Sequence, residues 1–101
     1  MSEESFVTRR DGTFELKGPL TFATVPQLIE RGAAWRQAGL SEEITIDLGQ
    51  VSRADSAGLA LMVEWQRLAR ENQHTLRFVN IPEQLRRLIR VSALENLFPL
   101  Q

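Results

Sequence analysis

The chain contains no cysteine and a single histidine, His74, among its 101 residues. The absence of cysteine excludes disulfide scaffolds, thiolate zinc sites and cysteine nucleophiles. One histidine supplies too few ligands for a typical transition-metal site. We therefore expect neither a metal nor another cofactor.

An excess of one charge and long apolar runs are also lacking. The formal net charge of −1 argues against a nucleic-acid binder, which needs a strong positive field. The longest apolar run, Leu59 to Val63, is far shorter than the ~20 residues that cross a bilayer. The first five residues are polar and acidic, unlike a secretory signal. These features predict a cytoplasmic protein.

What the chain does have is an ordinary globular composition. Hydrophobic residues make up 43% and charged residues 25% of the sequence. A chain of this length buries roughly two-thirds of its unfolded surface, which suffices for one core. We expect a single domain over residues 1–101.

The order of apolar patterns predicts strands alternating with helices. Asp11-Gly12 favours a hairpin turn between two early strands, the second ending at Gly18-Pro19. A first helix is expected from Thr24, with Thr24 and Gln27 as a capping box, to Gly39. The remaining elements are a strand at 44–48, a loop at 50–55, a helix at 56–72, a strand at 76–79 and a helix opened by Pro82. This order predicts an α/β fold with the helices mainly on one face of the sheet.

The most informative stretch is the junction between the strand at 44–48 and the helix at 56–72. Asp55-Ser56 stands at the helix start, and we expect Ser56 to be the N-cap. Because a helix N-terminus favours negative groups, this end could carry a phosphoryl group or receive a partner's anion. A plain helix cap is the alternative.

The same helix carries two apolar residues beside its predicted core face. Leu59 and Val63, four residues apart, lie between the core side and the charged side of the helix. An apolar flank next to a charged helix start is typical of a protein-docking surface. The alternative is that the last helix covers this flank.

Catalytic interpretations of the polar residues are weaker. Asp47 and Asp55 could form a carboxylate pair, but no second catalytic group converges on them. A triad of Ser56 and His74 with an aspartate lacks the Gly-x-Ser-x-Gly signature. Arginines at positions 86, 87 and 90 form a basic edge, either a solvated face or an anion site.

With these residues in view, the chain resembles the STAS domain family, shared by bacterial anti-sigma factor antagonists and the cytosolic tails of sulfate transporters. Asp55-Ser56-Ala57-Gly58-Leu59 is similar to the family's Asp-Ser-Ser/Thr-Gly-Leu motif. The Gly18-Pro19-Leu20 turn and the closing segment from Leu85 to Phe98 add to the resemblance. The stretch from Ile46 to Leu61 looks most like the MlaB branch, the small cytosolic subunits of phospholipid-transporting ABC systems.

The resemblance implies a STAS-type mixed sheet and a non-enzymatic interaction module. The main expectation is a subunit that binds and regulates the MlaF-like ATPase of such an ABC system, which maintains outer-membrane lipid asymmetry. It would then lie on the inner face of the inner membrane through that partner alone. The alternative is an anti-sigma factor antagonist, bound by an anti-sigma factor kinase and switched by phosphorylation of Ser56.

The resemblance also assigns site residues. The partner-binding residues are expected to be Arg53, Asp55, Ser56, Gly58, Leu59 and Val63, with Ser56 as the possible phosphorylation site. Ala57 replaces the motif's second hydroxyl, and Ala93 stands where the family frequently has glycine. No residue is expected to be catalytic.

Overall fold

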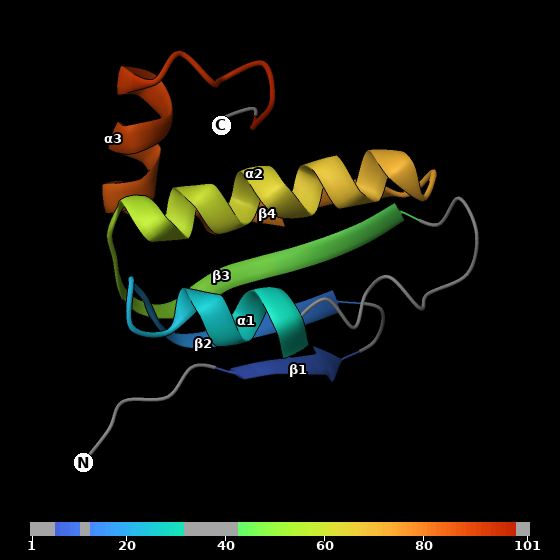
Figure 1. Ribbon diagram of the computed structural model, residues 1–101, viewed down its shortest axis with the longest axis horizontal. Coiled ribbons are helices and arrows are strands. Elements are labelled where there is room, and N and C mark those ends of the chain that lie inside the picture. The colour runs from blue at the N-terminus through green and yellow to red at the C-terminus, as the bar shows by residue number, and fades with distance from the viewer. Residues whose placement is uncertain (1–5, 11–12, 32–42, 99–101) are drawn as a thin grey trace.

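The computed structural model describes residues 6–10, 13–31 and 43–98. Along the chain it forms β1 (Phe6–Arg10), β2 (Thr13–Leu20), α1 (Val25–Arg31), β3 (Glu43–Ala54), α2 (Ser56–Glu71), β4 (Thr75–Val79) and α3 (Glu83–Val91) (Figure 1). This order matches the predicted alternation of strands and helices. The predicted end of the first helix at Gly39 lies outside the described residues.

The four described strands form one mixed sheet in the order β1-β2-β3-β4. β1 runs antiparallel to β2, and their register ends at Arg10 opposite Thr13, which fits the predicted hairpin. β2, β3 and β4 run parallel, and Ile46 lies between Phe14 and Phe78 on neighbouring strands. The predicted mixed α/β sheet is therefore confirmed.

The core lies between one face of this sheet and the helices. Along β3, Ile44, Ile46 and Leu48 are buried while the residues between them are more exposed. Figure 1 shows α1 and α2 on the same side of the sheet. From α2, Met62 and Trp65 enter the core almost completely. Burying a side chain of this size contributes about 1.5–3 kcal/mol, so this face of α2 anchors the helix.

β2 and β3 both extend further than the sequence predicted. β2 continues past Gly18-Pro19 to Leu20, and β3 runs through the expected loop at 50–55 as far as Ala54, which pairs with Leu20. The register shifts between Gly18 and Leu20. The shift omits Pro19 from the pairing, and proline has no N–H to donate. The Gly18-Pro19 pair therefore marks an irregularity inside β2 and not the end of the strand.

The predicted capping box at the first helix is wrong. α1 begins at Val25, and the buried Thr24 hydroxyl bonds within the preceding loop instead. Its Oγ1 accepts a hydrogen bond from the Thr21 N–H at 3.0 Å and donates to the Pro19 carbonyl at 2.7 Å. Thr24 thus holds the β2–α1 loop in shape.

None of the helices in the described ranges combines the length and the hydrophobicity that a bilayer crossing requires.

Candidate functional site

The candidate site lies where the carboxyl end of β3 passes into α2. The Asp55 backbone is extended (φ −127°, ψ −166°), and its N–H donates to the Leu20 carbonyl at 3.0 Å. Its Oδ1 accepts a hydrogen bond from the Ala57 N–H at 2.8 Å. Asp55 is therefore the N-cap of α2, and the prediction that Ser56 caps the helix is wrong. Ser56 is instead the first helical residue, and its side chain is exposed.

The second Asp55 carboxylate oxygen reaches the loop between β2 and α1. Oδ2 accepts a hydrogen bond from the Phe22 N–H at 3.3 Å. One carboxylate thus holds both the start of α2 and the loop, which lie at the same end of the sheet in Figure 1. We call the contacts of Asp55 with Leu20, Phe22 and Ala57 the Asp55 latch.

The latch places Phe22 beside the candidate site. The Phe22 side chain is 73% exposed, the second largest exposure among the large hydrophobic side chains described. Sequence reasoning missed this residue. The available signal was an aromatic residue in the short segment between a strand end and a helix start, flanked by Thr21 and Thr24.

The predicted apolar flank of α2 is only half correct. Leu59 is 8% exposed and belongs to the core, whereas Val63 is 36% exposed. α1 and α3 both pack against α2, so the buried arc of this helix is wider than one sheet contact would require. Leu59 falls inside that arc. The prediction that Leu59 lies on an exposed apolar flank is therefore wrong.

The exposed face of α2 begins with small and apolar residues. Ser56, Ala60 and Val63 stand at i, i+4 and i+7, which places them on one side of a helix. Arg53 is exposed at the end of β3, three residues before this face starts. We use the name docking face for a candidate contact surface made of these exposed residues: Phe22, Arg53, Ser56, Ala60 and Val63.

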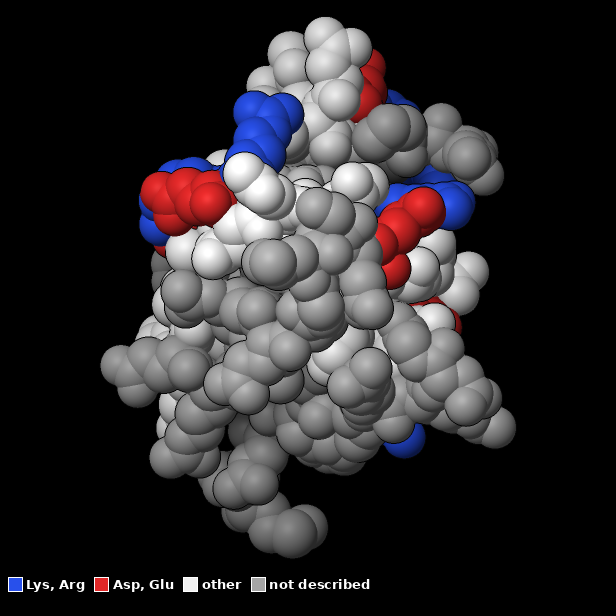
Figure 2. Space-filling view, turned by 90° about the vertical axis from the view of Figure 1, so that its right-hand side faces the viewer, with Lys and Arg blue, Asp and Glu red and all other residues white. Residues whose placement is uncertain are grey.

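The far end of α2 is charged but internally compensated. Arg67 forms ion pairs with Glu64 and with Glu71, and its hydrogen bond to Glu64 lowers the pKa of that carboxyl below its ordinary value. Figure 2, which faces this end of the molecule, shows acidic and basic groups side by side. The exposed residues of α2 that carry no charge therefore lie in its first turns, at Ser56, Ala60 and Val63.

Gly58 lies beneath the docking face and is buried. A Cβ built on it would stand 3.1 Å from the Leu20 Cβ, 3.3 Å from the Leu20 carbonyl oxygen and 3.3 Å from the Leu85 Cδ2. The glycine lets α2 approach β2 and α3 closely. Its contribution to the site is this packing, since it has no side chain to offer a partner.

The structure gives the residues of the catalytic alternatives other partners or distant positions. The Asp47 Oδ1 accepts hydrogen bonds from the Gly49 N–H at 2.8 Å and the Asn80 Nδ2 at 3.0 Å, so it braces β3 and β4. His74 follows the last turn of α2, and a helix of 16 residues separates it from Ser56 by about 24 Å. A catalytic triad containing both residues is therefore excluded.

No group of three or more His, Cys, Asp or Glu side chains within the described residues is placed to hold a metal ion.

Comparison with known proteins identifies the family. A family model described as "Mlab, STAS domain" matches residues 7–100. The chain belongs to the STAS domain family. Members of this family related to anti-sigma factor antagonists are non-enzymatic regulators, as the sequence led us to expect.

Curated STAS relatives include anti-sigma-B factor antagonists. The protein of Staphylococcus epidermidis is 33% identical over 89 residues, which cover 86% of this chain and 82% of that protein. The protein of Staphylococcus aureus (strain NCTC 8325 / PS 47) is 33% identical over 92 residues, covering 89% and 84%.

Solved structures of anti-sigma factor antagonists share the fold. An anti-sigma factor antagonist from Mycobacterium paratuberculosis superimposes with a TM-score of 0.67 at 25% identity, over 98% of this chain and 85% of that chain. The anti-sigma factor antagonist SpoIIAA in its unphosphorylated form gives a TM-score of 0.61 at 15% identity, over 95% and 99%.

Proposed function

We propose that this STAS domain binds a protein partner through the docking face and that phosphorylation of Ser56 switches this binding, as in an anti-sigma factor antagonist. The observation that carries the proposal is the exposed Ser56 hydroxyl at the first position of α2. Asp55 performs the capping, so the serine is not required there for helix stability. The curated relatives, which are anti-sigma-B factor antagonists, support this choice of function.

The geometry suggests how a phosphate on Ser56 would act. A phosphoryl group adds about −2 charge and three acceptor oxygens, which favour the N–H groups of a first helical turn. Two backbone N–H groups beside it, those of Phe22 and Ala57, already bond to the Asp55 carboxylate. The phosphate would compete with that carboxylate and repel it. Phosphorylation would thus weaken the Asp55 latch and move Phe22 on the docking face.

The proposed partner is an anti-sigma factor kinase, which binds the docking face in the cytoplasm. In this proposal the chain acts as a single STAS domain. Phe22 and Val63 supply apolar contact area at the face, and Arg53 supplies a charge at its rim. Such a mixture of apolar centre and charged edge is common at specific protein interfaces.

The experiment that tests this proposal is phosphorylation of the purified protein by the anti-sigma factor kinase of its own organism. Intact-mass spectrometry after incubation with ATP should show one added phosphate, and peptide mapping should place it on Ser56. Ser52, which is also exposed and lies on β3, provides the matched control. Ser56→Ala should abolish the mass increase and Ser52→Ala should leave it unchanged. An unmodified wild-type protein, or a phosphate on another residue, would overturn the switch.

A second candidate function uses the same docking face. The matching family model carries the description "Mlab", which favours a subunit of a phospholipid-transporting ABC system. The partner would then be the MlaF-like ATPase subunit, and the protein would sit at the inner membrane through it. Co-purification with that ATPase, combined with an unphosphorylated Ser56 in the kinase assay, would favour this candidate over the first.

A further inference from the structure

A cavity of about 520 Å³ lies beside β4, the last strand in the described sheet order. Its walls come from β4, the middle of α2, the start of α3 and the segment after α3. None of the docking-face residues lines it. Small-molecule sites in proteins have volumes in this range.

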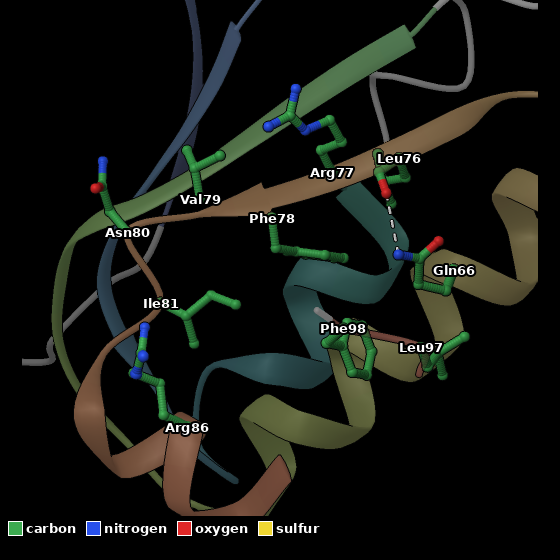
Figure 3. Close-up of a pocket in the computed structure, with 10 residues that line it drawn as sticks. All are labelled: Gln66, Leu76, Arg77, Phe78, Val79, Asn80, Ile81, Arg86, Leu97 and Phe98. Carbon is green, nitrogen blue, oxygen red and sulfur yellow. Dashed lines mark hydrogen bonds between the residues drawn. The ribbon is translucent and has the colours of Figure 1, made fainter. Parts of the chain in front are cut away.

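One wall of the cavity is apolar and partly open. The rings of Phe78 and Phe98 meet edge to face, with their centroids 5.6 Å apart and an interplanar angle of 74°. Phe98 is buried, whereas Phe78 and Leu97 are only partly buried. Figure 3 shows these side chains and Ile81 on one side of β4, while Arg77 and Val79 point to the other side. This wall fits an apolar chain.

The other end of the cavity is positively charged. Arg86 reaches it from α3 with a side chain that is 26% exposed, and its Nε lies 3.6 Å from a Glu83 carboxylate oxygen. The same carboxylate lies within 3.9 Å of Arg87 and 3.5 Å of Arg90. One carboxylate therefore faces three guanidinium groups, which gives this cluster a net charge of +2, and of its three arginines Arg86 is the one that lines the cavity. The described residues that line the cavity include no carboxylate.

A polar group closes the cavity at α2. The Gln66 Nε2 donates a hydrogen bond to the Leu76 carbonyl at 3.0 Å, which satisfies a backbone acceptor of β4 (Figure 3). The amide thus holds the middle of α2 against the strand.

We propose that this cavity binds a single-chain amphiphile with an anionic head group. The head pairs with Arg86 in addition to Glu83, because a guanidinium carries five N–H donors and can bind more than one anionic group. The chain lies against Phe78 and Phe98. This site is separate from the docking face, so the outcome of its test does not depend on the proposed function.

The test is a titration of the isotope-labelled protein followed by amide NMR shifts, with decanoate and decyl phosphate as anionic probes and decanol as the neutral control. Binding of either anionic probe should shift the amides of β4 and of Leu97 and Phe98, in a saturable manner. Decanol should bind at least tenfold more weakly.

Two arginine variants make the test specific. Arg86→Gln should weaken binding of the anionic probe at least tenfold, since a charged hydrogen-bonded pair is lost. Arg87→Gln, on the same helix with a side chain 73% exposed and outside the cavity lining, should bind like the wild type. Thermal melts would show that both variants fold. Equal binding of decanol, shifts spread over the surface, or an Arg86→Gln variant that binds normally would overturn the proposal.

Discussion

The carboxylate of Asp55 accepts a hydrogen bond from the Phe22 backbone N–H across 33 residues of sequence. Its other oxygen caps α2 through the Ala57 N–H. The contact joins two segments that each contribute to the docking face, so the shape of that face depends on one side chain.

Replacing Asp55 should therefore cost both helix stability and loop order. We expect Asp55→Ala to lower the free energy of unfolding by about 1–2 kcal/mol, because the N-cap is lost. Amide hydrogen exchange should accelerate at Phe22 as well as at Ala57. Ser56→Ala is the matched control and should change stability by less than about 0.5 kcal/mol, since its exposed hydroxyl is not the cap. An equal loss from both variants would mean that Ser56 shares the capping.

Leu59 and Val63 should respond differently to the same substitution. We expect Leu59→Asp to unfold the domain or lower its stability by at least about 3 kcal/mol, because a charge would enter the core. Val63→Asp should cost about 1 kcal/mol or less, because the side chain is already 36% exposed. Urea unfolding followed by tryptophan fluorescence, to which the buried Trp65 contributes, would measure both changes. Similar losses at the two positions would contradict the assignment of Leu59 to the core.

Gly58→Ala should destabilise the protein despite its favourable helix propensity. Propensity alone would favour alanine by about 1 kcal/mol. The added Cβ, however, would meet the Leu20 carbonyl oxygen at 3.3 Å, and the Asp55 N–H already holds that carbonyl in place. We expect a lower urea midpoint than in the wild type. A higher midpoint would show that β2 and α2 can separate at no cost.

Ala93→Gly should have the opposite effect. Ala93 follows α3 with φ of 57°, a left-handed conformation in which a Cβ is unfavourable. Hydrogen bonds from the Leu94 N–H to the Ile89 carbonyl and from the Ala93 N–H to the Arg90 carbonyl end the helix there. Glycine should raise the free energy of unfolding by about 0.5–1 kcal/mol.

Ala60→Gly is the control for this substitution, because it lies inside a helix and should lower stability by about 1 kcal/mol. If both glycine variants lose stability, strain at Ala93 contributes nothing measurable.

The sequence predicted the element order and the sheet type because strand and helix periodicities are local signals. It also placed the start of α2 at Ser56 correctly, although β3 continues to Ala54, beyond the predicted end of that strand at Leu48. It failed at Ser56 because serine and aspartate are both good caps, and adjacent candidates are told apart only by backbone dihedrals. The exposure of Phe22 depends on a contact between distant segments, which local patterns do not encode. Leu59 was misplaced because helix packing on two sides widened the buried arc.

The central claim of the proposed function is that the docking face binds the protein partner. The most direct measurement is a calorimetric titration of the candidate partner, which is the anti-sigma factor kinase or the ABC ATPase. The partner is titrated with the wild-type protein, with Val63→Asp and with Val91→Asp. Val91 is 84% exposed on α3, outside the docking face, so the second variant carries the same change of charge elsewhere. The docking face predicts that Val63→Asp weakens binding at least ~10-fold and that Val91→Asp binds like the wild type. Wild-type affinity in Val63→Asp, or equal losses in both variants, would contradict it.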